Sequence, residues 1–138
     1  MIWFCAVAAA EPVSVDGVEG WGDVRWGDAP PESVRAGGNG PGREHYQVLA
    51  PGFAGLDVER TTYEYADGRM VAVLQVFRGA STADRLLEIW ASHYGPPQHS
   101  DGVVDVWRGE RVRLTIRRQR TDLTVASMAW VGEPPASR

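Results

Sequence analysis

The stretch STADRLLEIWASHYGPP, residues 81–97, holds one complete helix pattern with a recognisable residue at each end. Ser81 belongs to the residue types that cap a helix N-terminus by accepting a backbone hydrogen bond. Asp84 puts a carboxylate in the first turn, where the helix dipole favours negative charge. Gly95, followed by two prolines, is typical of a helix end. We therefore predict one helix between Ser81 and Gly95.

The apolar residues of this helix recur at three- and four-residue spacing and form one stripe, made of Ala83, Leu86, Leu87, Trp90 and Tyr94. A stripe of this kind is buried in a folded domain, so we expect the helix to pack on a sheet. Polar residues, including Arg85, Glu88 and His93, are expected to face away from it.

A β-hairpin is predicted before the helix, closed by Asp67-Gly68 as the two central residues of a tight turn. This turn pairs Tyr65 with Met70, Tyr63 with Ala72, and Thr61 with Leu74. We assign these six residues to the core face, because the opposite face, which includes Val73 and Gln75, is more polar.

Three runs of alternating hydrophobicity follow the helix, at residues 103–107, 111–117 and 122–130, with turns at Gly109-Glu110 and near Gln119-Arg120. These turns pair Trp107 with Val112, Ile116 with Leu123, and Leu114 with Val125 on one buried face. The outward face then collects three arginines and their apolar neighbours, namely Arg111, Arg113, Arg117, Val104, Val106, Met128 and Trp130.

The predicted order of elements gives an α+β fold. A short helix is expected after Asp28, ended by Gly37-Gly38, so the chain reads as two helix-then-strand-meander halves. The helices would pack on one face of a predominantly antiparallel sheet. We divide the chain into an apolar leader at 1–10, a linker or loosely attached strand at 11–22, a single domain at 23–132 and a polar tail at 133–138.

Composition limits the classes of function. The chain has 138 residues, of which 43% are hydrophobic and six are tryptophan, which is enough for one core. The net charge of −4 argues against a general nucleic-acid binder or a polybasic membrane-surface protein. All fourteen basic residues are arginine, so a P-loop lysine and a Schiff-base lysine are excluded.

The first ten residues, MIWFCAVAAA, resemble the apolar and cleavage regions of a secretory signal without its basic start. A short N-terminal strand or frayed tail is the alternative. The run is too short to span a bilayer. With cleavage before Glu11 the mature chain has no membrane span and no cysteine, so we expect an extracytoplasmic protein, either periplasmic or secreted.

No catalytic or metal motif is complete. His93, His99, Asp101 and Asp105 cluster along the sequence around the helix exit, and imidazole plus carboxylate can bind zinc. Their spacing matches no established metal motif. We therefore predict no catalytic residue, no metal and no cofactor.

The arginine-rich strand is the predicted binding site, formed by Arg111, Arg113, Arg117, Met128 and Trp130. Guanidinium groups engage carboxylates and phosphates, and tryptophan with arginine is typical of interface centres. The alternative is a solvated strand face, because arginine is the only basic residue that this chain uses.

Several aromatic and turn residues suggest a family. Trp26-Gly27-Asp28, the run YEYADGRM at 63–70, the run YGPP at 94–97 and Trp107 form a pattern similar to that of small exported bacterial domains. The chain resembles the beta-lactamase-inhibitor-like and BamE-like folds over roughly residues 21–130. The resemblance implies a protein-binding or envelope-assembly module rather than an enzyme, and it assigns no residue a role.

The leading hypothesis is a non-enzymatic exported binding module that contacts a protein or an anionic envelope polymer through the outer face of its C-terminal strands. The rival hypothesis is a small metal-dependent hydrolase that uses His93, His99 and Asp101. A purely structural role in an envelope assembly is a third reading, which the sequence does not separate from the first.

Overall fold

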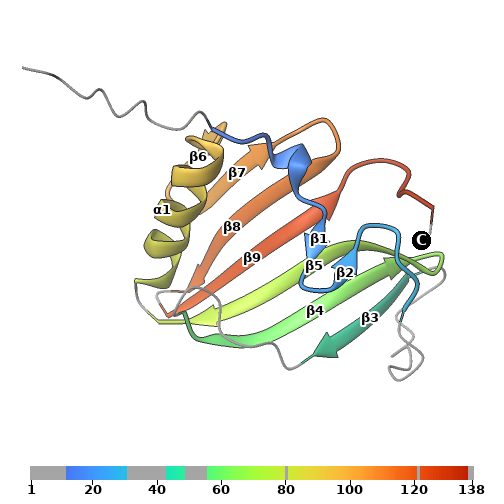
Figure 1. Cartoon of the computed structure of the whole chain (residues 1–138). Helices are drawn as coiled ribbons and strands as arrows, with labels where there is room; N and C mark the ends of the chain where they lie inside the picture. The colour runs from blue at the N-terminus through green and yellow to red at the C-terminus, as the bar shows by residue number, and fades with distance from the viewer. Residues whose placement is uncertain (1–11, 31–42, 49–55, 80, 121, 137–138) are drawn as a thin grey trace, which may run out of the picture.

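The computed structural model describes residues 12–30, 43–48, 56–79, 81–120 and 122–136, with only the backbone at 43–48. Figure 1 shows its elements, which are η1 (Val15–Gly17), β1 (Gly20–Trp21), β2 (Val24–Arg25), β3 (Arg43–Val48), β4 (Val58–Ala66), β5 (Arg69–Arg78), α1 (Thr82–Tyr94), β6 (His99–Ser100), β7 (Val104–Arg108), β8 (Val112–Arg120) and β9 (Leu123–Trp130).

Seven of these strands form one antiparallel sheet in the order β3-β4-β5-β9-β8-β7-β6. The last strand, β9, lies in the middle, paired with β5 on one side and β8 on the other. The helix α1 connects β5 to the β6 edge and contacts β8. Strands β1 and β2 form a separate small hairpin.

The prediction of an α+β fold with two helix-then-strand-meander halves is wrong. The described chain is mostly β, with one α-helix and one continuous large sheet. The halves do not exist as units because β5 and β9 pair along seven positions, from Ala72 with Ala129 to Arg78 with Leu123. Most of the short helix expected after Asp28 falls on residues 31–42, outside the described residues.

The helix α1 has the predicted stripe and the predicted end. Ala83, Leu86 and Trp90 are buried, and Gly95 takes a φ of 82° while its N–H donates to the Ala91 carbonyl. The N-terminus differs from the prediction, because the Ser81 side chain makes no capping bond. The Thr82 hydroxyl instead donates to the Arg78 carbonyl, which ties the helix to the end of β5.

The first hairpin contains a β-bulge that the sequence pattern does not reveal. Asp67 and Gly68 both have positive φ, as a two-residue hairpin turn requires, and Tyr65 pairs with Met70 as predicted. Beyond that pair the register shifts, so Tyr63 faces Val73 and Thr61 faces Gln75. A one-residue slip exchanges the two faces of a strand, so Val73 and Gln75 are buried and Leu74 is not on the core face.

The register of β8 and β9 also differs from the prediction. β8 continues through Gln119 and Arg120, where the turn was expected, and β9 begins at Leu123. Ile116 pairs with Ala126, and Leu114 pairs with Met128. The difference of three residues is odd, so it reverses the faces of β9. Met128 is therefore buried in the core and Trp130 packs against it.

Residues 12–22, expected as a linker or a loosely attached strand, pack onto the sheet. Val15 is buried in the core, and the Val13 N–H donates to the His93 carbonyl at the end of α1. The start of the tail is attached too, because Arg69 pairs with Glu133 and donates to the Pro134 carbonyl.

The expected leader at residues 1–10 lies outside the described residues, so export stays a prediction. No helix in the described part of the chain is both long enough and apolar enough to cross a membrane.

Candidate functional site

The large sheet has an inner face and an outer face. Figure 1 shows α1 and the β1–β2 hairpin on the same side of the sheet, which we name the inner face. The core residues of β8, namely Val112, Leu114 and Ile116, belong to this side. The alternate residues Arg113, Thr115 and Arg117 belong to the outer face, where none of the described helices or strands covers them.

The structure separates the five predicted binding residues. Arg113 and Arg117 are exposed on the outer face. Met128 is buried on the inner face, so it is not part of the arginine surface. Arg111 and Trp130 lie together elsewhere, lining a hollow of about 480 Å³ beside Asp16.

The outer face carries an arginine pair that the sequence did not reveal. Arg108 on β7 is the direct cross-strand partner of Arg113 on β8, and both are exposed. Four residues further along β8, Arg117 lies between Val104 of β7 and Val125 of β9. None of these three arginines makes an ion pair with another described residue.

Other arginines of the described chain are paired with carboxylates. Arg78 makes two hydrogen bonds to Glu59, each 2.9 Å from nitrogen to oxygen, and Arg118 bridges Asp84 and Asp105. These bonds raise the pKa of both guanidinium groups above its ordinary value. The three outer arginines differ from Arg78 and Arg118 because none of them has a carboxylate partner among the described residues. Four further arginines share this property, namely Arg60, Arg85, Arg111 and Arg120.

The His and Asp residues of the rival hypothesis serve the fold separately. His99 contacts Asp101 at 3.2 Å between Nε2 and Oδ2, and the other Asp101 oxygen accepts the N–H groups of Val103 and Val104. These backbone bonds, with His99, lower the pKa of Asp101 to about 2. His93 lies on α1, away from this pair, and lines a groove on the inner face.

Asp105 is almost completely buried and is bound by the Ser100 hydroxyl and by Arg118. Within the described ranges, no group of three or more His, Cys, Asp and Glu side chains is placed to hold a metal ion. The described residues therefore give no support to the metal cluster of the rival hypothesis.

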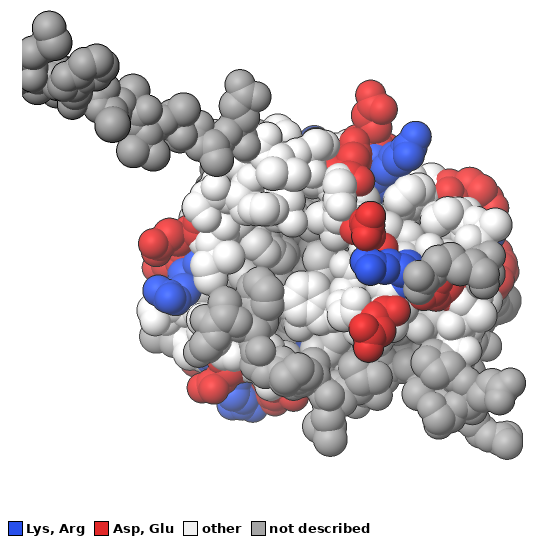
Figure 2. All heavy atoms as spheres, viewed as in Figure 1, with Lys and Arg blue, Asp and Glu red and all other residues white. Residues whose placement is uncertain are grey.

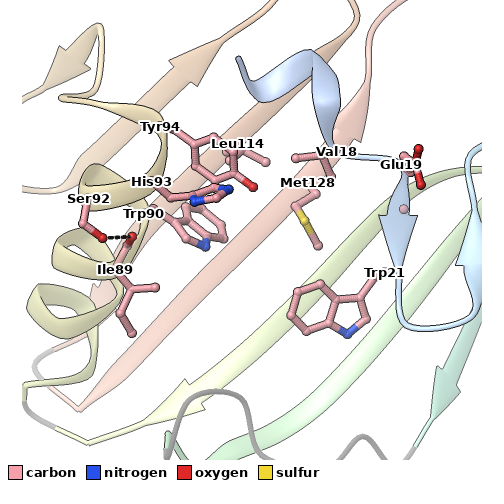
Figure 3. Close-up of a pocket in the computed structure, with 11 residues that line it drawn as sticks. Val18, Glu19, Trp21, Ile89, Trp90, Ser92, His93, Tyr94, Leu114 and Met128 are labelled. Atoms are coloured by element: carbon pink, nitrogen blue, oxygen red, sulfur yellow. Dashed lines mark hydrogen bonds between the residues drawn. The ribbon is translucent and has the colours of Figure 1, made fainter. Parts of the chain in front are cut away.

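The inner face is hollowed between α1 and β1. This groove has a volume of about 470 Å³ and is lined mainly by apolar side chains. Figure 3 shows them converging from α1, from β1 and the residues just before it, and from the sheet strands β8 and β9. Its principal lining residues are Val18, Trp21, Ile89, Trp90, Tyr94 and Met128. Figure 2 shows uncharged side chains over the described surface between α1 and β1, with acidic and basic groups standing beside the β1–β2 hairpin.

Aromatic contacts order the helix side of the groove. Trp90 packs edge-on against Trp107 with 5.6 Å between ring centroids, and His93 packs edge-on against Tyr94 at 4.7 Å. Burial raises the pKa of the Tyr94 hydroxyl above its ordinary value, so it stays protonated at neutral pH. The helix stripe indicated Trp90 and Tyr94 from sequence, whereas Trp21 came from a segment expected to be a linker.

Comparison of the chain with protein families, curated proteins and solved structures finds no match. The resemblance to exported bacterial domains stays a prediction. Function is therefore inferred from the outer face and the groove alone.

Proposed function

We propose that this protein is a non-enzymatic binding domain whose outer face, centred on Arg108, Arg113 and Arg117, binds an acidic surface of a partner protein. The observation that carries the proposal is the direct cross-strand pairing of Arg108 with Arg113. Like charges at directly opposed positions destabilise a sheet. A carboxylate placed between the two guanidinium groups would remove this repulsion.

The charges of the outer arginines suit a carboxylate partner. Arginine presents a planar fork of N–H donors that matches a carboxylate with two parallel hydrogen bonds. The formal net charge of the whole chain is −4, so the chain as a whole repels an anion. Attraction must come from these arginines locally, which favours a partner that contacts them at short range.

Apolar side chains between the arginines favour a protein over a polymer. Val104 and Val125 flank Arg117, and Leu74 of β5 lies on the same face, paired with Ser127. All three are partly exposed. A protein surface can cover them with apolar groups, whereas a highly charged anionic polymer offers no such complement.

The test is a binding titration with two defined probes, a synthetic peptide of alternating glutamate and leucine, and inorganic polyphosphate. We expect the peptide to bind and the double variant Arg113→Ser, Arg117→Ser to weaken it about tenfold, which corresponds to about 1.4 kcal/mol. The matched control is Arg85→Ser, Arg111→Ser, which removes the same charge from two exposed arginines, one on α1 and one in the hollow beside Asp16. It should change peptide affinity less than twofold.

Three results would contradict the proposal. Equal affinity of the peptide for the wild type and the outer-face variant would show that Arg113 and Arg117 do not form the binding site. Failure of the wild type to bind the peptide would show that the partner is not an acidic protein surface. Tighter binding of polyphosphate than of the peptide would replace the protein partner with an anionic envelope polymer.

A further inference from the structure

The inner-face groove has the size and lining of a small-molecule site. Its volume of about 470 Å³ falls in the range of roughly 300–1,000 Å³ that is usual for ligand pockets. Two tryptophans, a tyrosine and a methionine are among its lining residues, and Figure 3 shows Trp90 on one side with Met128 and Trp21 across the gap. Such walls favour an apolar ligand that contains a ring or a branched chain.

One indole N–H in the wall of this groove has no hydrogen-bond partner among the described residues. The indole N–H groups of Trp26, Trp107 and Trp130 each donate to a backbone carbonyl, at 2.6, 2.8 and 2.8 Å respectively. Trp90 is 6% exposed, yet its indole N–H makes no hydrogen bond to any other residue that the structure describes. A buried indole usually finds an acceptor, so Trp90 is an exception among these four.

The indole N–H of Trp90 is not fully enclosed by the described residues. In the described residues, no fully buried side-chain nitrogen or oxygen lacks a partner, so the Trp90 N–H keeps some contact with solvent. Trp90 is a groove-lining residue. A ligand in the groove can therefore offer this N–H an acceptor that the protein does not provide.

The charges at the rim of the groove favour an uncharged ligand. α1 ends at Tyr94, and the partial negative charge of a helix C-terminus disfavours an anion there. The Glu19 carboxylate at the opposite rim is held by Arg25 at 3.0 Å, so a cation would have to compete for it.

We infer that the groove between α1 and β1 binds an uncharged, largely apolar small molecule whose single hydrogen-bond acceptor takes the indole N–H of Trp90. This site lies on the inner face, whereas Arg113 and Arg117 lie on the outer face. The inference therefore does not depend on the protein-binding function proposed above, and each can fail alone.

The first test is a fluorescence titration of the full chain with Nile red, an uncharged aromatic dye that carries a carbonyl acceptor. We expect saturable binding that the variant Ile89→Ser weakens at least fivefold, because Ile89 lines the groove. Leu87→Ser is the matched control, since Leu87 is a partly buried residue of the same helix that is not a groove-lining residue. It should change the affinity less than twofold.

The second test follows the hydrogen bond itself. In the ¹⁵N-labelled protein, the indole N–H resonance of Trp90, assigned by its loss in Trp90→Phe, should move downfield when Nile red binds. A Nile red complex that leaves this resonance in place would overturn the role of Trp90. No saturable binding, equal weakening in Leu87→Ser and Ile89→Ser, or tighter binding of an anionic anilinonaphthalene dye would overturn the site or its ligand class.

Discussion

The Asp16 side chain joins the N-terminal segment to the turn between β7 and β8. Its carboxylate accepts the backbone N–H groups of Glu110, Arg111 and Val112 at 2.9, 2.8 and 2.9 Å. Gly109 permits this approach, because a Cβ built there would lie 2.2 Å from an Asp16 oxygen. One side chain therefore satisfies the turn between β7 and β8 and fixes residues 12–22 beside the groove.

We expect Asp16→Asn to lower the free energy of unfolding by about 1 kcal/mol or more, because it replaces charge-assisted bonds to backbone donors by weaker ones. These backbone bonds hold the pKa of Asp16 below its ordinary value of about 3.8. The stabilisation is thus complete above that value and is lost as the pH falls through the depressed pKa. Urea unfolding at several pH values measures both effects.

The control for this prediction is the variant itself, which has no carboxylate to protonate at position 16. The difference in stability between wild type and Asp16→Asn should shrink as the solution is acidified below pH 4. A difference that stays constant with pH would show that the carboxylate charge is not what holds the turn.

At the scale of elements, sequence patterns predict α1 and the Asp67-Gly68 turn correctly, but they predict the wrong register for the pairs β4–β5 and β8–β9. Gly95 and the stripe through Leu86 and Trp90 are local signals, and they are correct. The bulge in the first hairpin is not a local signal, because it depends on which side chains of β5 are buried when the whole sheet packs. Gln75 shows why the pattern misleads, because it is polar yet buried, with its amide donating to the Thr61 hydroxyl.

The second error is in the register of β8 and β9, and it explains why the predicted binding site includes residues of the inner face. Gln119 and Arg120 look like a turn, but β8 continues through Arg120 with an irregularity after Arg118. This irregularity depends on the pairing of both strands, which single-strand alternation does not record. Met128 and Trp130 were therefore assigned to the wrong face, while Arg113 and Arg117 were placed correctly.

Arg118 connects three elements, and we expect its loss to be costly. It binds Asp105 of β7 at 2.7 Å and Asp84 of α1 at 2.8 Å, and Asp105 is only 1% exposed. Arg118→Met leaves the Asp105 carboxylate buried without its cation, so the free energy of unfolding should fall by about 3–5 kcal/mol. Urea unfolding followed by circular dichroism measures this loss.

The double variant Arg118→Met, Asp105→Asn tests the cause, because it removes the buried charge together with its partner. It should recover part of the stability that the single variant loses. If the double variant is as unstable as the sum of the two single variants, the pair contributes through packing rather than through its charges.

At the scale of the whole molecule, one sheet carries two surfaces of different chemistry. The inner face holds a mainly apolar groove between α1 and β1 (Figures 1 and 3). The outer face presents the exposed arginines Arg108, Arg113 and Arg117. Sequence reasoning could not find the groove, because its walls come from segments as distant as Trp21, Trp90 and Met128. The pairing of β9 between β5 and β8 places Met128 in the middle of the sheet, and α1 and β1 supply Trp90 and Trp21 to the same groove.

The open basic face implies a conflict between the stability of the free domain and its proposed function. Arg113 faces Arg108 across the strands, so Arg113→Glu turns a repulsive cross-strand pair into an attractive one. We expect it to raise the free energy of unfolding by about 0.2–1 kcal/mol and to abolish binding of the glutamate-leucine peptide. Urea unfolding and the peptide titration measure the two effects in the same protein sample.

Arg117→Glu separates the two effects, because Arg117 faces Val104 and Val125 rather than another arginine. It should abolish peptide binding as Arg113→Glu does, but without the gain in stability. If both variants gain equal stability, the cause is the general reduction of positive charge on β8 and not the Arg108–Arg113 pair. If neither gains any, the two guanidinium groups avoid one another in solution, and the repulsion that motivates an acidic partner is absent.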